Sequence, residues 1–292
     1  MTSGFRRSKL LKKFGSTNLC ICDYKKYERK LAVTKTGIIV LSFGIADRRI
    51  RDLSTSVLLE DMRKAFPGFL IREAFCSRAL REKIFDNEGE KVLSLQEALE
   101  KFKEEGKKRV IVQPAFLMEG EEYEGMSEVI KQYKNDFEFL ESGRSATTKL
   151  SSKKLSDALM SGIVAKDEVT VLAGHGSLHR ANSMYFSVNE ELHKGGFTKA
   201  FIGTFESKPD IFDVLEFLKG QKEKNITLMP FLSLAGNHAS KDIFGEENSY
   251  LRSLKDAGYE VRCIKKGLCE YKEIRNLWLE AAKEQLEKFP SV

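Results

Sequence analysis

The sequence predicts an α/β protein made of two Rossmann-like domains, each with a parallel four-stranded sheet flanked by helices. From residue 37 onward, short β-branched runs alternate with longer amphipathic stretches, which is typical of βαβ units and a parallel sheet. This alternation occurs twice, as two series of four strands separated by the polar stretch 142–154. A weak repeat supports a duplication, since Pro, five residues and Gly follow a strand at Pro114 and again at Pro230.

The predicted strands are short apolar runs, as expected for strands buried on both faces of a sheet. They cover residues 37–42, 69–75, 109–114, 137–141, 169–173, 199–203, 226–232 and 260–264. The predicted helices are longer stretches with helical periodicity. They cover residues 49–65, 93–105, 121–134, 180–194, 210–219, 247–257 and 272–288. We expect an N-terminal domain over 37–160, a C-terminal domain over 161–271, and a last helix within 272–292 that packs back on the first domain.

Composition excludes several classes of protein. With 41% hydrophobic and 32% charged residues, the chain is expected to be globular and cytoplasmic, since no run approaches the roughly 18 apolar residues that cross a bilayer. Five irregularly spaced cysteines favour a reducing compartment over a disulfide framework. Residues 1–36 carry ten Lys/Arg and two Asp/Glu, and we interpret them as a basic extension. No nucleic-acid motif follows, so we expect no nucleic-acid partner; homo-oligomerisation is left open.

Three residues of metal-binding type follow predicted strands of the second domain. His175 follows "VTVLAG", Glu206 follows "KAFIGTF" and His238 follows "ITLMPFLSLAGN", at spacings of 31 and 32 residues. Each spacing is one strand–helix unit, and ligands of open parallel sheets bind outside the carboxyl ends of the strands. Two imidazoles and a carboxylate suit a first-row divalent metal with open positions. Imidazole also accepts protons near neutral pH.

Each of these residues also has a structural alternative. A single His after a strand is often only a hydrogen-bonded structural group, and a carboxylate at Glu206 would favour the start of a helix. His179 lacks the HExxH pattern of zinc proteases, so we interpret it as a helix start or a support for the loop. His193 is interpreted as a surface residue at a helix end, and the acidic run 119–124 as a solvated first helical turn.

The surrounding loops contain no cofactor fingerprint. Gly174, Gly176 and Gly236 are expected to let a large flat ligand approach the backbone. The loop 42–49, "SFGIADRR", has neither the GxGxxG nor the GxxxxGK[ST] pattern, and the chain has no GxSxG nucleophile motif. The sequence therefore favours chemistry that uses no organic cofactor and no ATP.

Seven segments form a recognisable set when they are taken in chain order. They are "VLSFG", "REAFCSR", "VQPAFLMEGEEYE", "AGHGSLHRAN", "GTFESKPDIFDV", "LMPFLSLAGNHASKDIFGEENS" and "AGYEVRCIKKGLCEYKEIRNLW". Together they resemble the anaerobic, single-subunit sirohydrochlorin cobaltochelatases, which belong to the class II chelatases. The similarity runs from about residue 37 to 288.

The resemblance implies a fold, an activity and a site. It implies two Rossmann-like domains with a cleft between them for a tetrapyrrole. It also implies an enzyme, a lyase, that inserts Co²⁺ as a substrate metal into sirohydrochlorin during anaerobic cobalamin biosynthesis. It assigns His175 as metal ligand and proton acceptor, Glu206 as a catalytic metal ligand, and His238 as the third ligand.

Further contacts are expected around this site. Substrate contacts are expected at Ser42, Phe43, Gly44, Gly174 and Gly236, and supporting contacts at His179 and Asp242. This chain departs from the usual family pattern at Ile45, Ala46, Cys76, Phe116 and Asn237, which affects expected substrate contacts more than metal chemistry. Two alternatives remain: a chelatase of the same fold that inserts Fe²⁺ or Ni²⁺, and a tetrapyrrole or metal carrier without catalysis.

Overall fold

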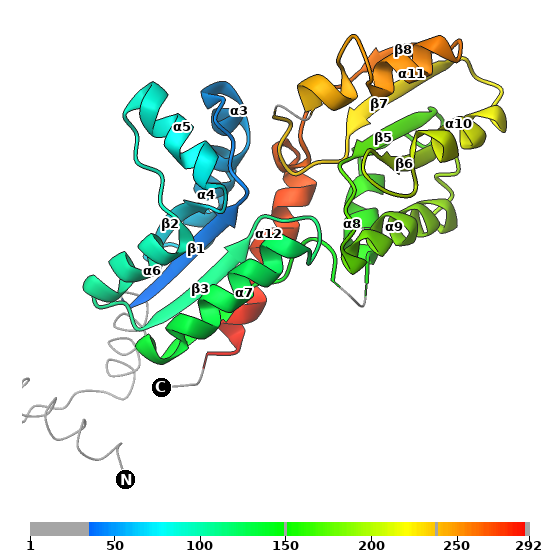
Figure 1. The fold of residues 1–292 in the computed structure, drawn as a ribbon. Helices are drawn as coiled ribbons and strands as arrows, with labels where there is room; N and C mark the ends of the chain where they lie inside the picture. Colours follow the sequence, from blue (N-terminus) through cyan, green and yellow to red (C-terminus); the bar gives the residue numbers. More distant parts are fainter. Residues whose placement is uncertain (1–34, 149–150, 237–238, 290–292) are drawn as a thin grey trace, which may run out of the picture.

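The computed structural model describes residues 35–148, 151–236 and 239–289, and it contains two separate parallel sheets (Figure 1). The first, in the order β2-β1-β3-β4, has β1 (Thr36–Ser42), β2 (Leu70–Phe75), β3 (Arg109–Pro114) and β4 (Phe139–Ser142). The second, in the order β6-β5-β7-β8, has β5 (Thr170–Gly174), β6 (Ala200–Thr204), β7 (Asn225–Pro230) and β8 (Glu260–Cys263). The predicted fold class is confirmed, and each strand lies within two residues of its predicted bounds.

The two sheets repeat each other in detail. Pro114 and Pro230 end the third strand of their sheets. The amide after Pro114 donates to the carbonyl oxygen of Leu41 at 2.7 Å, and the amide after Pro230 donates to that of Ala173 at 2.7 Å. The short sequence repeat therefore corresponds to equivalent positions in two copies of one topology.

The central strands explain the continuous apolar runs in the sequence. β1 and β5 each have a neighbouring strand on both sides, and every residue of both strands is buried. A strand covered by helices on both faces needs apolar side chains at every position rather than at alternate ones. β8, at an edge of its sheet, is correspondingly half exposed.

Five α-helices accompany the first sheet and form with it the first lobe. They are α3 (Arg48–Leu53), α4 (Thr55–Ala65), α5 (Arg78–Glu88), α6 (Leu95–Glu104) and α7 (Glu121–Tyr133), and α7 is followed by the short η1 (Lys134–Asp136). The helix predicted over 49–65 is interrupted at Ser54, whose φ of −125° and ψ of −87° are not helical. α5 was not among the predicted helices, and it buries only Ile84.

The second sheet and its helices form the second lobe. Its helical segments are η2 (Arg180–Asn182), α9 (Ser183–Lys194), α10 (Ile211–Lys219), η3 (Ala239–Ile243), α11 (Tyr250–Asp256) and η4 (Leu268–Glu270). Side chains of α9 join the apolar cluster on one face of the sheet, and those of α10 and α11 join the cluster on the other. The sheet is therefore covered on both faces.

Two helices connect the lobes. α8 (Lys153–Met160) follows the first sheet in the chain, and α12 (Lys272–Glu287) returns from the second lobe to the first (Figure 1). The indole N–H of Trp278 donates to the carbonyl oxygen of Phe116 at 3.1 Å, and Arg275 pairs with Asp61 at 2.7 Å. One apolar cluster runs through α4, α8, α9 and α12, so the lobes share part of their core.

The first strand begins earlier than the sequence suggested. Thr36 already pairs with Arg109, and the carbonyl oxygen of Lys35 accepts the amide of Lys108 at 2.9 Å. The basic extension predicted over 1–36 therefore overlaps β1 at Thr36, and its residues 1–34 lie outside the described residues. None of the helices in the described ranges is both long and apolar enough to cross a membrane.

Candidate active site

Two of the three predicted metal ligands lie next to each other. His175 follows β5, and Glu206 lies two residues after the end of β6. The two strands are neighbours with Gly174 paired to Thr204, so their loops emerge side by side. Nε2 of His175 lies 3.6 Å from Oε1 of Glu206. This distance is too long for a hydrogen bond, but it places the two solvent-facing side chains directly beside each other.

The site is open to solvent on the side of these two groups. The His175 side chain is 41% exposed and that of Glu206 is 60% exposed. Backbone contacts hold the loops together, since the carbonyl oxygen of His175 accepts the amides of Phe205 at 3.1 Å and Glu206 at 3.0 Å. These contacts fix the two loops, and with them the backbone of both residues, relative to each other.

The third predicted ligand, His238, lies outside the described residues. β7, from which its loop departs, pairs with β5 on the side opposite β6. In the described part of the chain, no three His, Cys, Asp or Glu side chains are arranged to hold a metal ion. Asp242, predicted to support the ligands, lies half-buried in η3.

The glycines of the site are required by the protein's own packing. A Cβ atom at Gly174 would lie 2.6 Å from the ring of Tyr185, and one at Gly236 would lie 2.6 Å from Cδ1 of Ile45. Gly176 has a φ of +84°, and a Cβ there would lie 2.7 Å from the Ser207 hydroxyl. The protein's own packing therefore gives a reason for glycine at these positions in addition to the expected approach of a flat ligand.

The loop after β1 brings the first lobe to the same region. Ile45, buried in that loop, contacts Gly236 of the second lobe. Of the predicted substrate residues in the loop, Ser42 is buried and Gly44 packs on Phe75 with a φ of +105°, whereas the ring of Phe43 is 47% exposed. Phe43 is thus the one whose side chain is available to a ligand.

A second contact joins the lobes through His179. Its Nδ1 accepts the amide of Ala181 at 3.1 Å, so Nε2 carries the proton of the neutral ring and faces Oε1 of Glu124, in α7, at 3.2 Å. Arg180 reaches the same carboxylate at 3.3 Å. The imidazole of His179 and the guanidinium of Arg180 hold the pKa of Glu124 below its usual range. His179 thus both starts η2 and connects the two lobes.

His193 is not the surface residue that the sequence suggested. Its Nε2 lies 3.0 Å from the carbonyl oxygen of Ala200, and its ring stacks on Phe217. It is half-buried, so its role in the described structure is to hold α9 against β6.

Several groups at the site were not predicted from the sequence. Tyr185 accepts the amide of Gly176 at 3.3 Å, and burial raises the pKa of this phenol to about 12. Cys76, one of the departures from the family pattern named above, follows β2 in the first lobe; burial raises the pKa of its thiol to about 12, which makes it a poor metal ligand at neutral pH. Leu178, three residues after His175, is 96% exposed. Of these residues, only Leu178 could have been singled out from the sequence as a contact residue, because it is an apolar residue between polar ones in a loop.

A cavity of about 590 Å³ lies elsewhere between the lobes. Its lining includes Met118 and Thr147 of the first lobe and Arg180 of the second, but neither His175 nor Glu206. The paired imidazole and carboxylate are groups able to bind a metal and accept protons, so they, and not this cavity, form the candidate active site.

A family model and known relatives match most of this chain. The family described as "Cobalt chelatase (CbiK)" matches residues 36–287. The sirohydrochlorin cobaltochelatase CbiKC of Nitratidesulfovibrio vulgaris is 28% identical over 266 residues, which are 88% of this chain and 93% of that protein. The sirohydrochlorin cobaltochelatase of Salmonella typhimurium is 24% identical over 252 residues, which are 84% of this chain and 94% of that protein.

Solved structures support the fold independently. SirB from Bacillus subtilis, determined with Fe³⁺, has a TM-score of 0.60 at 14% identity and covers 87% of this chain and 98% of its own. DR2241 from Deinococcus radiodurans has a TM-score of 0.57 at 14% identity and covers 88% of this chain and 56% of its own. The resemblance drawn from the seven segments is confirmed by the family match, and the chain belongs to the cobalt chelatase (CbiK) family.

Proposed function

We propose that the protein is a sirohydrochlorin cobaltochelatase, which inserts Co²⁺ into sirohydrochlorin in anaerobic cobalamin biosynthesis. The family match over residues 36–287 and the names of two relatives support this activity. The observation that carries the site is the pairing of His175 with Glu206 at adjacent strand ends. In this proposal, His238 contributes a third ligand.

The separation of the two side chains suits a shared metal ion. A first-row divalent ion such as zinc forms bonds of about 2.0–2.2 Å to imidazole nitrogen and carboxylate oxygen. Two such bonds span at most about 4.3 Å, so the 3.6 Å separation of the two atoms is compatible with both binding one ion. The exposure of both groups leaves room for water or a pyrrole nitrogen to complete the coordination.

The same two groups would accept the protons that the metal displaces. Insertion exchanges two pyrrole N–H protons for one divalent ion, and the lone pair that binds the metal is the one that binds a proton. As the ion passes to the tetrapyrrole, Nε2 of His175 becomes free to take a proton. The carboxylate of Glu206, released from the ion in the same way, takes the second proton, and both groups return their protons to the solvent to which they are exposed. An open site therefore suits transfer better than a closed tetrahedral one, which would retain the ion.

The tetrapyrrole would lie between the lobes, against exposed groups of both. Phe43 and Leu178 present apolar surface from opposite lobes, and the macrocycle has apolar faces. Sirohydrochlorin also carries many carboxylates, for which Arg is a good partner. Arg48 and Arg49 are exposed directly after the β1 loop, and we propose that they bind some of these carboxylates.

Two alternatives use the same geometry. Nitrogen and oxygen ligands do not by themselves select cobalt over Fe²⁺ or Ni²⁺, so the protein could insert either of those ions. A carrier would bind the metal or tetrapyrrole without accelerating insertion. The deciding experiment is sirohydrochlorin metallation followed by absorbance with Co²⁺, Fe²⁺ and Ni²⁺, under multiple and single turnover. A rate with Co²⁺ no faster than the reaction without protein would contradict the proposal.

A further inference from the structure

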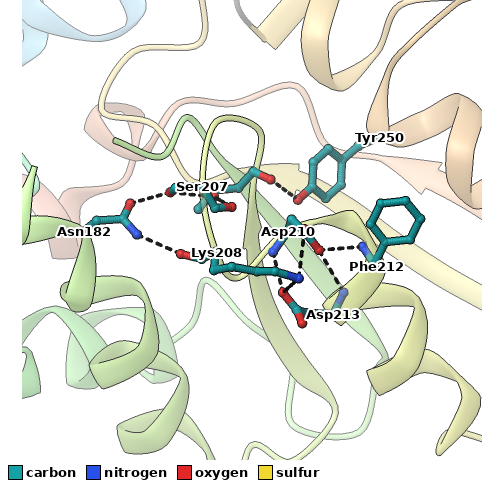
Figure 2. A network of polar contacts seen from close by, with 8 residues as sticks. Asn182, Ser207, Lys208, Asp210, Phe212, Asp213 and Tyr250 are labelled. Carbon is teal, nitrogen blue, oxygen red and sulfur yellow. Dashed lines mark hydrogen bonds and ion pairs between the residues drawn. The ribbon is translucent and has the colours of Figure 1, made fainter. Parts of the chain in front are cut away.

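One side chain joins the two loops that carry His175 and Glu206. Oδ1 of Asn182 accepts the amide of Ser177 at 2.9 Å and the hydroxyl of Ser207 at 2.8 Å. Its Nδ2 donates to the carbonyl oxygen of Lys208 at 2.7 Å. Figure 2 shows the bonds to Ser207 and Lys208, which reach across to the loop after β6.

These contacts require an amide in one orientation. The Ser177 amide can only donate and the Lys208 carbonyl can only accept, so the positions of Oδ1 and Nδ2 are determined by their partners. An Asp at this position would put an oxygen opposite the Lys208 carbonyl, and an Ala would lose all three bonds. A shorter side chain, or one that can only accept hydrogen bonds, therefore cannot form all three of these bonds.

The link lies next to both proposed ligands. Ser177 is two residues after His175, and Ser207 directly follows Glu206. The Glu206 loop is closed further by the Thr204 hydroxyl, which donates to the carbonyl oxygen of Ser207 at 2.6 Å. Movement of Asn182 would therefore displace both ligand loops relative to each other.

We infer that Asn182 is a positioning residue, which holds His175 Nε2 and Glu206 Oε1 at a separation that one metal ion can bridge. This inference rests on the proposed function of the two ligands. Such a residue is needed because the two ligand side chains belong to different loops and are 41% and 60% exposed, so their separation depends on the hydrogen bonds that hold the two loops together.

The test compares Asn182→Ala with Asn189→Ala, a matched control in the same lobe. Asn189 is also an amide bonded at both ends, since Oδ1 accepts the Ile202 amide at 2.8 Å and Nδ2 donates to the Ile202 carbonyl at 3.0 Å. It holds the edge strand β6 and contacts neither ligand loop. Insertion rates are measured against Co²⁺ and against sirohydrochlorin, together with the melting temperature.

We expect Asn182→Ala to raise the KM for Co²⁺ by about 10- to 100-fold, as loss of a residue that orients metal ligands usually does. The KM for sirohydrochlorin should stay within a few-fold. Asn189→Ala should lower the melting temperature without changing the KM for Co²⁺. An unchanged KM for Co²⁺ in folded Asn182→Ala, or equal shifts in both variants, would overturn the inference.

Two further variants keep the outcome interpretable. Asn182→Asp preserves the size of the side chain but replaces the bond to Lys208 with repulsion, and it should also raise the KM for Co²⁺. This variant provides the test if Asn182→Ala fails to fold. His175→Ala is measured in parallel. If it retains normal insertion, the proposed site is wrong; if it is inactive while both Asn182 variants bind Co²⁺ normally, only the positioning role is wrong.

Discussion

Nε2 of His175 lies 3.6 Å from Oε1 of Glu206, and the two residues follow the ends of two adjacent parallel strands. Residues 31 positions apart meet because β5 and β6 are neighbours and end in register. The loop geometry after each strand then turns both side chains to the same side. This pair is the basis of the first two predictions.

His175→Ala should lower the rate of Co²⁺ insertion by about 10²- to 10⁴-fold, because it removes both a ligand and the proton acceptor. The imidazole is 41% exposed, so the fold should survive the substitution, with a change in the free energy of unfolding of about 1 kcal/mol, the ordinary size for a single substitution. Absorbance kinetics and thermal unfolding measure the two effects. His193→Ala should behave in the opposite way, with a lower melting temperature and normal insertion by the folded protein. If His175→Ala lost activity only through unfolding, its proposed role would be wrong.

Glu206→Gln should mainly weaken metal capture. The amide keeps the size of the carboxylate but loses its charge, so we expect the KM for Co²⁺ to rise at least about tenfold, the lower range for disturbing a metal site. Excess Co²⁺ should partly restore the rate, which saturation kinetics would show. Glu216→Gln is a suitable control, because Glu216 is 74% exposed on α10 and pairs only with Lys219 among the described residues. A KM for Co²⁺ equal to that of the control would contradict the ligand role.

The contact between Glu124 and His179 should affect the tetrapyrrole more than the metal. It joins α7 of the first lobe to η2 of the second, so Glu124→Ala should let the lobes separate and raise the KM for sirohydrochlorin several-fold. The KM for Co²⁺ should remain close to normal. Glu128→Ala, on the exposed side of the same helix, is the control. Equal sirohydrochlorin KM values in the two variants would show that the contact has no role in substrate binding.

The basic extension should be dispensable for catalysis. Residues 1–34 lie outside the family match, and removing residues 2–34 leaves Lys35 and all of β1 in place. We therefore expect insertion rates within a few-fold of the full chain. A deletion that also removes Lys35 and Thr36 should be less stable, because it cuts the start of the central strand. A large loss of rate with the shorter deletion would show that the extension takes part in the reaction.

The strands, and the meeting of His175 with Glu206 at adjacent strand ends, could be predicted because their signals are local. An apolar run such as residues 38–41 indicates a buried strand wherever it occurs, and His175 and Glu206 follow such runs directly. The repeat at Pro114 and Pro230 showed the duplication because a strand-ending proline has a fixed place in each copy.

The remaining features depend on contacts between distant residues. Asn182 meets Ser207 and Lys208 only because β5 and β6 are adjacent, and an Asn before a helix is otherwise an ordinary capping residue. Glu124 looks like any acidic residue in a first helical turn until His179 is placed beside it. Pairings of this kind follow from the tertiary structure, so no local pattern could show them.

The last prediction concerns the return of α12 to the first lobe. Glu284 accepts two hydrogen bonds from Arg144, at 2.9 and 3.0 Å, and one from Lys154 at 3.1 Å. The guanidinium and, to a smaller extent, the ammonium group lower the pKa of this carboxyl to about 2. The unfolded chain has a Glu pKa of about 4.3. A depressed folded pKa means that the unfolded state binds more protons between these values, so stability rises with pH there. The contribution is complete above about pH 5 and is lost as the pH falls toward about 2.

Glu284→Gln should therefore destabilise the protein at pH 7 and have a clearly smaller effect at pH 3. Because the Glu284 side chain is 45% exposed, solvent screening limits the loss at pH 7 to about 1 kcal/mol or less. Urea unfolding at pH 7, 5 and 3 would measure it. Glu280→Gln, on the same helix with only a 3.6 Å contact to Lys154, should show a smaller loss. A Glu284→Gln deficit that stays constant across this range would mean that the guanidinium–carboxylate pair does not stabilise the docking of α12.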